Sequence, residues 1–320
     1  MQPVRWGFLG SGWLVNARTA DALHQAAGAE LTACGARDIE RALRANPIRA
    51  YGSYQEVIDD PDIEAVYIAL ANDVHLHWIL AALEAGKHVL CEKPMTLSAA
   101  DTQTAFDAAE KAGLLLVEAV WTRWHPRMQR IATLASSGAL GTITDVTSSF
   151  TWESSPAALV GNYRFFPEFG GGAFYDVGIY PLNALIACIP NAQDLKVETA
   201  EFMLNEHGAD LTAIVNLTWN AGSSHAKVTA SFAMPESQEL TIVGQHGVIR
   251  IPDSDAHASW KEATRLAYGE NLESFDVVDA YQLMFEAMSS RIRGGDNWIL
   301  PAQDSISVAM LVDQAIALRP

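Results

Sequence analysis

Strand-like and helix-like segments alternate through the first third of the chain, and this alternation constrains the fold more than any other feature. The strand-like segments are short apolar runs at residues 4–9, 30–36, 65–71, 88–91 and 114–117. Helix-like segments lie between them at residues 13–27, 38–45 and 74–86, and a further helix opens at Ser98 as its N-cap. Repeated alternation of this kind predicts parallel βαβ units.

After residue 122 the pattern changes to runs of β-type composition, most of which follow one another without a helix. The runs cover residues 142–152, 197–204, 211–219, 225–233, 238–243 and 247–251. A helical insertion at residues 176–188 interrupts them, and helical patterns at 277–293 and 302–318 close the chain. Strands without intervening helices predict one large, mostly antiparallel sheet.

The first predicted strand ends in Gly10-Ser11-Gly12, and a helix follows directly. Phosphates bind well at such a turn because backbone N–H groups and the helix dipole both face the anion. Glycine also lets the backbone turn tightly and approach a pyrophosphate. Val15 replaces the third glycine of the G-x-G-x-x-G fingerprint, so the motif is incomplete. Its place inside βαβ units favours a dinucleotide site over an ordinary turn.

These features predict an α/β protein of two domains, because 320 residues are too many for one ordinary core. Residues 1–122 are predicted to form an N-terminal Rossmann dinucleotide-binding domain. Residues 123–320 are predicted to form a C-terminal α+β domain, whose large, mostly antiparallel open sheet serves substrate binding and oligomerisation. We expect the C-terminal helix to pack back on the first domain.

The charge after the second strand bears on the choice of cofactor. An acidic residue there favours NAD, whereas an arginine accommodates the 2′-phosphate of NADP. The strand runs into Ala36-Arg37-Asp38, so Arg37 is the first charge past it and NADP is favoured over NAD. In the alternative interpretation, Arg37 is a solvated loop residue, and Asp38 caps the next helix or holds the ribose.

A lysine follows the fourth predicted strand, in the sequence Glu92-Lys93-Pro94. Ligands bind at the carboxyl ends of the strands in such sheets. A lysine there donates to a substrate hydroxyl or carbonyl, and burial lowers its pKa toward a useful range. Pro94 restricts Lys93 to extended geometry. Taken alone, a lysine near a strand end is usually a solvated charge.

Residues 85–94, AGKHVLCEKP, resemble a signature of the glucose–fructose oxidoreductase and inositol dehydrogenase family (Gfo/Idh/MocA). Residues 7–13, GFLGSGW, fit the same family, as do Asn72 and His75; Ala71 replaces the proline that is usual there. The resemblance implies that Lys93 contacts both the nicotinamide ribose and the substrate. The implied cofactor site comprises Gly10, Ser11, Gly12, Trp13, Leu14, Ala36, Arg37, Leu70, Asn72, His75, Glu92, Lys93 and Arg164.

A carboxylate and a tyrosine stand four positions apart in residues 162–183, NYRFFPEFGGGAFYDVGIYPLN. Asp176 and Tyr180 therefore share one face of a helix, and the glycines at 170–172 are expected to give it a flexible approach. Oxidation of a carbinol requires removal of its hydroxyl proton, which a tyrosine achieves when a nearby Lys⁺ lowers its pKa. The alternative is a helix carboxylate beside a buried tyrosine.

This segment also resembles the family, in which the tyrosine of the Asp-x-Gly-x-Tyr form is the acid–base residue. The resemblance implies that role for Tyr180, with Asp176 orienting the reacting groups. Residues 118–126, EAVWTRWHP, resemble the branch of dimeric dihydrodiol dehydrogenases and NADP-linked D-xylose dehydrogenases. The implied substrate site comprises Trp121, Arg123, Trp124, Tyr163, Asp176 and Tyr180. The first three fit a packed seam between the domains equally well.

Composition excludes several classes of function. The net charge of −17, from 38 acidic and 21 basic residues, repels phosphate backbones, so no nucleic-acid partner is expected. We expect neither a membrane span nor a signal peptide. The cysteines, Cys34, Cys91 and Cys188, form no CxxC pair and fit reduced thiols in the cytoplasm. No metal is expected, because the histidines lack paired ligand spacing.

The predicted protein is a cytoplasmic, dimeric NAD(P)-dependent dehydrogenase or reductase acting on CH–OH groups. Hydride passes between the nicotinamide and a carbinol or carbonyl of a sugar, polyol or cyclic diol. The resemblance favours an aldose such as D-xylose, or a trans-dihydrodiol. Lys93 and Tyr180 carry the proton chemistry. Two alternatives stay open: an enzyme that keeps its cofactor bound while it interconverts sugars or cleaves glycosides, and a non-catalytic NAD(P)-binding regulator.

Overall fold

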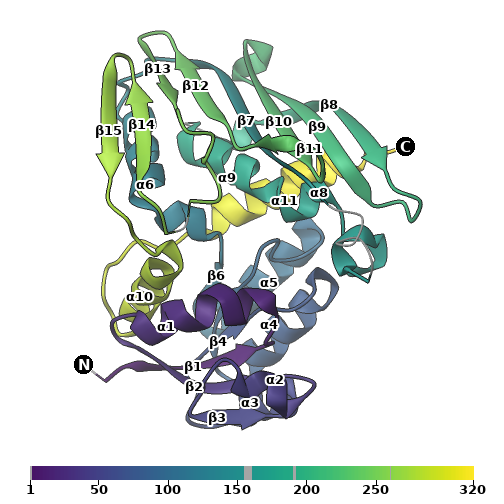
Figure 1. Cartoon of the computed structure of the whole chain (residues 1–320), viewed down its shortest axis with the longest axis vertical. Coiled ribbons are helices and arrows are strands. Elements are labelled where there is room, and N and C mark those ends of the chain that lie inside the picture. The colour runs from purple at the N-terminus through teal and green to yellow at the C-terminus, as the bar shows by residue number, and fades with distance from the viewer. Residues whose placement is uncertain (1, 155–160, 190–191, 260) are drawn as a thin grey trace. The chain divides into compact units, whose positions relative to one another are not determined.

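The chain divides into two compact units in the computed structural model, which describes residues 2–154, 161–189, 192–259 and 261–320 (Figure 1). The first unit comprises Met1–Trp124 and Asp279–Ala302, and the second comprises His125–Val278 and Gln303–Pro320. The chain therefore crosses into the second unit just after Trp124 and returns to the first for one later segment.

The first unit is built on a six-stranded sheet in the order β3-β2-β1-β4-β5-β6. Its strands are β1 (Val4–Leu9), β2 (Ala29–Gly35), β3 (Arg49–Tyr51), β4 (Ala65–Ile68), β5 (His88–Cys91) and β6 (Leu116–Glu118). Every pairing is parallel, which confirms the predicted Rossmann fold. The strand order reverses between β1 and β4, and the crevice outside their carboxyl ends is where such sheets bind ligands.

Helices flank this sheet in Figure 1. They are η1 (Val15–Thr19), α1 (Ala20–Gln25), α2 (Ile39–Leu43), α3 (Tyr54–Asp59), η2 (Asn72–Val74), α4 (His75–Glu84), α5 (Ala99–Ala112), η3 (Trp121–Trp124) and α10 (Ala280–Ile292). The predicted cap of α5 is confirmed, because the Ser98 side chain accepts from the Asp101 N–H. Alternate strand residues face opposite sides. Ile68 and Val89 pack with Ile79 of α4 in one apolar core.

The other face of the sheet is covered by α10, the penultimate helix of the chain. Its Phe285 ring lies 5.3 Å from Trp6, 5.8 Å from Phe8 and 5.4 Å from Tyr67. The Trp6 indole N–H also donates to Ser289 Oγ at 3.0 Å. This helix belongs to the first unit, whereas the last helix of the chain belongs to the second unit from Gln303 on. The aromatic residues of β1 and β4 fit the apolar side of α10.

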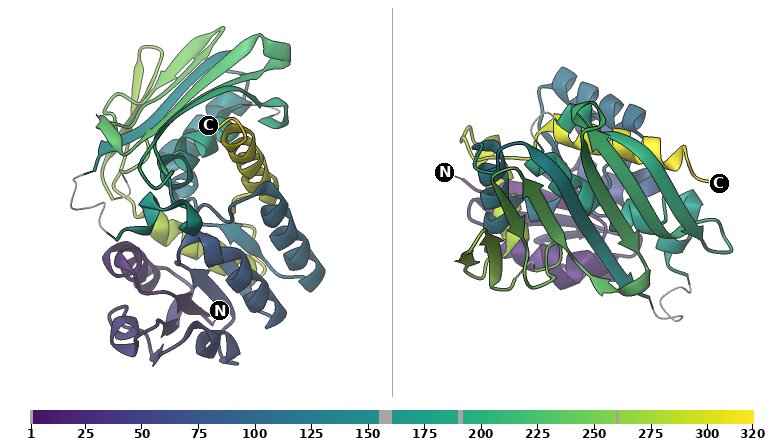
Figure 2. Two further views of the ribbon diagram at one scale, coloured as in Figure 1. Left: turned by 90° about the vertical axis from the view of Figure 1, so that its right-hand side faces the viewer. Right: turned by 90° about the horizontal axis from the view of Figure 1, so that it is seen from above.

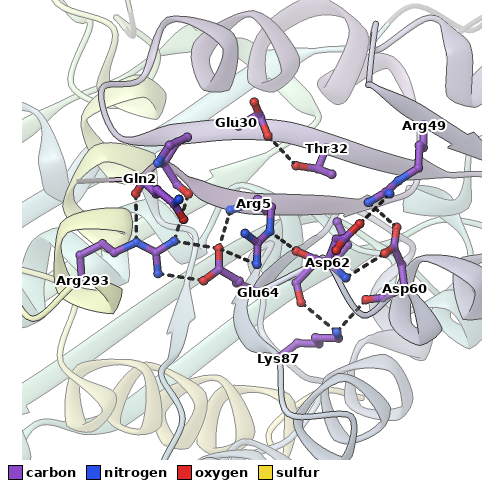
Figure 3. Close-up of polar contacts among 12 residues, drawn as sticks. Gln2, Arg5, Glu30, Thr32, Arg49, Asp60, Asp62, Glu64, Lys87 and Arg293 are labelled. Carbon is purple, nitrogen blue, oxygen red and sulfur yellow. Dashed lines mark hydrogen bonds and ion pairs between the residues drawn. The ribbon is translucent and has the colours of Figure 1, made fainter.

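Charged side chains form a network near the amino ends of the strands, away from the crevice (Figure 3). Arg293, just after α10, pairs with Glu64 at 2.7 Å, and Arg5 at the start of β1 lies 3.6 Å from the same carboxylate. Arg49 pairs with Asp62 at 2.8 Å. Arg293 lowers the pKa of Glu64, so this carboxylate is ionised at neutral pH. The network fastens α10 and the loops to the sheet.

Lys87 has a structural role although it lies within the family signature. Its side chain is buried, and Nζ donates to the carbonyl oxygens of Asp60 and Ile63, each at 2.8 Å (Figure 3). Lys87→Met leaves two buried carbonyls without a donor, so we expect the free energy of unfolding to fall by about 2–4 kcal/mol. Urea titration measures this, with exposed Lys111→Met as control. Equal stability of the two variants would contradict the assignment.

The second unit is built on a nine-stranded sheet in the order β15-β14-β13-β12-β7-β10-β9-β8, with β11 beside β7. The strands are β7 (Ile143–Glu153), β8 (Lys196–Leu204), β9 (Asp210–Trp219), β10 (Ser224–Ser231), β11 (Ala233–Ser237), β12 (Leu240–Gly244), β13 (Gly247–Arg250), β14 (Thr264–Tyr268) and β15 (Asn271–Phe275). Among the described pairings only β7 with β10 is parallel, so the predicted mostly antiparallel sheet is confirmed.

Helices cover one face of this sheet, and the right-hand view of Figure 2 shows strands without helices over the other. The helical segments are α6 (Pro126–Ser136), η4 (Tyr163–Phe165), η5 (Pro167–Phe169), α8 (Ala173–Asp176), α9 (Ile179–Cys188), η6 (Ala192–Asp194), η7 (Asn220–Gly222) and α11 (Ala302–Ile316). Along β7 and β10, Val146 and Val228 are buried while Asp145, Thr147 and Lys227 are exposed. One face therefore forms the core. Of the helices described, none has the length and apolar character needed to cross a membrane.

Candidate functional site

The glycine turn after β1 has the geometry that a dinucleotide phosphate requires. Gly10 has φ +107°, and a Cβ there would collide with the Ala69 carbonyl oxygen. A Cβ on Gly12 would meet nothing within 4 Å, so this backbone borders open space. The helix begins at the next residue, which leaves its first N–H groups free for an anion. The turn thus fits a pyrophosphate group.

The helix after this turn departs from a regular Rossmann helix at Val15. Val15 stands where the fingerprint has its third glycine, and its side chain is fully buried. The segment Val15–Thr19 is a π-helix, whose wider turn starts at this residue. Trp13 is 72% exposed, with the Arg18 guanidinium 5.4 Å from its ring centre, and Leu14 is half-buried. The incomplete motif therefore changes the helix and leaves the turn intact.

Two arginines lie near the end of β2. Ala36 is buried and Arg37 is exposed. The Asp38 carboxylate caps α2 by accepting from the Glu40 N–H at 3.0 Å, as one sequence interpretation held. Arg41, which sequence reasoning missed, reaches the glycine turn: its Nη2 lies 3.4 Å from the Ser11 carbonyl oxygen. Its place in the helix that follows Arg37 was the available signal.

His75 joins the loops that follow β4 and β5. Its Nδ1 lies 2.9 Å from the Pro94 carbonyl oxygen, and its Nε2 lies 3.2 Å from that of Leu70. The ring is fully buried, and burial lowers the pKa of His75. Both ring nitrogens face backbone carbonyls, so the contacts of His75 fix the two loops; Asn72, three residues earlier, is also buried.

Glu92 and Lys93 emerge at the carboxyl end of β5. Glu92 is 6% exposed, and its Oε1 accepts from the Tyr67 hydroxyl at 2.6 Å. Burial raises the pKa of Glu92 to about 7, against the opposing effects of Lys93 and Tyr67. Lys93 is half-buried, and Glu118 holds the following loop by accepting from the Met95 N–H at 2.9 Å. Buried carboxylates therefore support the backbone on both sides of Lys93.

The three η3 side chains assigned to the substrate site are packed within the first unit. Trp121 stacks on Tyr281 with ring centres 5.2 Å apart. Trp298 lies edge-on to Trp124 at 5.3 Å, and the Arg123 guanidinium is 5.7 Å from the Trp298 ring centre. Sequence reasoning missed Tyr281 and Trp298, which come from the late segment of this unit. The Trp124 indole N–H is buried and has no partner among the described residues, so one donor remains available.

Asp176 and Tyr163 both flank Arg164 in the second unit. Arg164 Nε donates to Asp176 Oδ2 at 2.9 Å, and its guanidinium lies 4.9 Å from the Tyr163 ring centre. Asp176 is the main influence that raises the pKa of Arg164, and Tyr180 contributes in the same direction. Tyr180 is 8% exposed, and Phe150 lies 5.5 Å from its ring. The structure thus brings Arg164, which the sequence assigned to the cofactor site, together with Tyr163, Asp176 and Tyr180, which it assigned to the substrate site.

The helix expected over residues 176–188 is two helices. α8 ends at Asp176 and α9 begins at Ile179, with Val177 and Gly178 between them. Asp176 and Tyr180 therefore lie on either side of a break, although Tyr180 N–H still donates to the Val177 carbonyl at 3.3 Å.

The glycines before α8 are tightly packed and give no flexible approach. A Cβ on Gly171 would collide with the carbonyl oxygens of Phe166 and Tyr163, and one on Gly172, at φ +131°, would collide with Asp210. Asp210 is fully buried and holds the start of α8 by accepting from the Phe174 N–H at 2.8 Å. The packing therefore fixes α8, which ends in Asp176.

Two family models match this chain. The model for the Gfo/Idh/MocA oxidoreductase family, NAD-binding Rossmann fold, matches residues 4–119. The model for the GFO/IDH/MocA C-terminal domain matches residues 128–250. The chain belongs to this family. It is an NAD(P)-dependent oxidoreductase, as the resemblance implied.

Named relatives extend over most of the chain. It is 33% identical to D-xylose 1-dehydrogenase (NADP(+)) 2 of Haloferax volcanii, over 82% of this chain and 80% of the relative. It is 29% identical to trans-1,2-dihydrobenzene-1,2-diol dehydrogenase of Xenopus laevis, over 98% of this chain and 97% of the relative. The structure matches that of a 3-ketoreductase from Actinomadura kijaniata in complex with NADP and TDP-benzene, with TM-score 0.86, 27% identity and coverage of 99% and 98%.

Proposed function

We propose that this member of the family moves hydride between NADP and a carbinol or carbonyl of a sugar, polyol or cyclic diol, with an aldose or a trans-dihydrodiol as the favoured substrate. The observation that carries the proposal is the Arg164–Asp176–Tyr180 group at the break between α8 and α9. The family supplies the cofactor domain, and this group supplies the acid–base chemistry. The named xylose and dihydrodiol dehydrogenases support the substrate class.

Each proposed catalytic residue has a separate task. When bound, the nicotinamide supplies the hydride acceptor or donor. The Tyr180 hydroxyl takes the proton from the substrate hydroxyl during oxidation and returns it during reduction, with the Lys93 ammonium lowering its pKa. Asp176, paired with Arg164, accepts a hydrogen bond from a neighbouring substrate hydroxyl and so orients the substrate ring. Trp121, Arg123, Trp124 and Tyr163 line the substrate site, and His75 positions the loops beside the nicotinamide.

Positive charge near the end of β2 supports NADP over NAD. Arg37 is exposed, and Arg41 lies beside the turn that Gly10 and Gly12 shape. Because the Asp38 carboxylate is engaged as the cap of α2, it competes poorly for a ribose diol. Two guanidinium groups then remain for the 2′-phosphate.

A substrate screen tests the proposal directly. Aldoses, inositols, sugar acids and diols are each supplied with NADP and with NAD, and NAD(P)H is followed by its absorbance. We expect stoichiometric NADPH with at least one aldose or cyclic diol. Cofactor that stays bound on dilution, with no net NADPH, would instead indicate sugar interconversion or glycoside cleavage. No turnover across the panel, with cofactor bound, would indicate a regulator.

We also propose that the outer face of the second unit's sheet joins two copies of the chain. The face carries both signs of charge, for example Asp145 beside Lys227, and many threonines. Two copies that meet through this face should therefore repel each other less than a net charge of −17 would suggest. Eight strands at ~4.8 Å spacing span roughly 35 Å, enough for the ~800 Å² per partner of a stable dimer. Light scattering should give twice the chain mass, and Thr147→Glu should give monomer. A monomeric parent protein would contradict the proposal.

A further inference from the structure

Glu92 carries a buried carboxyl group next to the catalytic lysine, and the proposed proton chemistry does not use it. Its Oε1 accepts from the Tyr67 hydroxyl at 2.6 Å, and its Oε2 faces the backbone N–H of Lys93 at 3.3 Å. A carboxyl group that is 6% exposed must be compensated, because isolated buried charge is costly. The two hydrogen bonds compensate it and also link the core of the sheet to Lys93.

The Tyr67 hydroxyl is held in place by aromatic packing. Its ring is fully buried, 4.9 Å from the Phe8 ring and 5.4 Å from the Phe285 ring. Phe8 comes from β1 and Phe285 from α10, so rings from two elements fix the tyrosine. The donor to Glu92 therefore cannot swing away without opening the core.

Few other ionisable groups of the first unit act on this pair. Lys93 lowers the pKa of Glu92, and Glu118 of β6 raises it. Glu92 raises the pKa of the neighbouring Cys91 thiol, which burial already raises. Tyr281 of α10 acts on Tyr67 and raises its pKa further. Among these groups of the first unit, Lys93 is the cation that favours the ionised form of Glu92.

We propose that Glu92 is a positioning residue for Lys93, and that the Tyr67 hydroxyl keeps its carboxylate ionised and aligned for that role. The inference deepens the proposed function and rests on it for the part that Lys93 plays in turnover. An ionised Glu92 attracts the lysine ammonium and fixes the backbone from which it projects. A neutral Glu92 loses the attraction to the ammonium and holds the Lys93 backbone more weakly, so the ammonium is no longer kept in position.

The sign of the pH effect follows from burial and hydrogen bonding. Burial brings the pKa of Glu92 to about 7, so the carboxyl gains a proton as the pH falls through neutrality. The hydrogen bond from Tyr67 favours the ionised form. Its removal raises the pKa of Glu92, and the active form is then lost at a higher pH.

The test compares pH profiles of kcat/KM for the parent, Tyr67→Phe and Glu92→Gln enzymes. We expect the parent to lose activity below about pH 7. Tyr67→Phe should move this acid limb upward, and if the limb moves by about one pH unit, activity at pH 6 should fall about tenfold further. Glu92→Gln should lack this acid limb, and its kcat/KM should remain low across the pH range. Tyr51→Phe, which removes a tyrosine–carboxylate hydrogen bond to Asp60 elsewhere in the sheet, is the matched control and should keep the parent profile.

A second readout needs no substrate. Lysines are reductively methylated with ¹³C, and the Lys93 resonance is assigned from its absence in Lys93→Arg. In the parent this resonance should move as the pH crosses the range near 7, and the movement should vanish in Glu92→Gln. Persistence of the movement in Glu92→Gln would overturn the inference, as would parent-like profiles in both variants. If no substrate is turned over, the proposed function fails, while the resonance still decides the inference.

Discussion

Tyr180→Phe is expected to lower kcat by about 10²–10⁴-fold while NADPH still binds. The variant removes one hydroxyl and keeps the ring, which packs 5.5 Å from Phe150 and 6.3 Å from His257. The substitution should therefore change the stability of the fold little, whereas the substrate hydroxyl loses the group that takes its proton. Because the tyrosine acts on the proton and not on the nucleotide, the loss falls on turnover.

The measurement separates a chemical defect from a structural one. Steady-state rates give kcat, fluorescence titration gives the Kd for NADPH, and thermal unfolding gives stability. Tyr268→Phe is the matched control, because that hydroxyl donates to the Ala139 carbonyl at 3.1 Å on β14, in another part of the second unit. Parent-like turnover in Tyr180→Phe would remove this residue from the mechanism. An equal loss in Tyr268→Phe would make the effect one of folding.

The parallel sheet was predictable because its buried strands are continuous apolar runs. The apolar runs at residues 4–9 and 88–91 match β1 and β5 to the residue, and Ser98 marks the N-cap of α5. β3 was missed because it has only three residues, all half-buried, and carries Arg49. β14 and β15 were missed for a related reason: each has exposed or half-buried residues among its five, which breaks the apolar pattern.

The proposed site residues Lys93, Asp176 and Tyr180 were identified because sequence signatures contain them. Residues that act through distant contacts gave no such signal. Asp210 supports α8 from 36 positions away, and Trp298 reaches the η3 aromatics from a late loop. Such partners are selected by tertiary packing, which local pattern does not record. The break between α8 and α9 was hidden likewise, because its residues keep nearly helical backbone angles.

Cofactor choice gives the second large expected effect. The double variant Arg37→Ser/Arg41→Ser should weaken NADPH binding by on the order of 10²–10⁴-fold, because hydrogen bonds to charged groups contribute about 1.5–3 kcal/mol each. NADH lacks the 2′-phosphate, so its Kd should change little. The ratio of the two dissociation constants, which expresses the preference for NADPH over NADH, should therefore fall by nearly the full loss of NADPH affinity. Substitution of Arg41 also removes a hydrogen bond, since its guanidinium contacts the Ser11 carbonyl.

The single variants and one control apportion this effect. Arg44→Ser removes an exposed arginine from the end of the same helix and should leave both dissociation constants unchanged. If Arg41→Ser weakens NADH and NADPH equally, Arg41 supports the glycine turn and Arg37 alone meets the phosphate. If the double variant keeps the parent affinity for NADPH, the arginines are solvated charges and the NADP assignment fails. A loss of affinity for NADPH alone would exclude both of these explanations. It would require a guanidinium group at the 2′-phosphate.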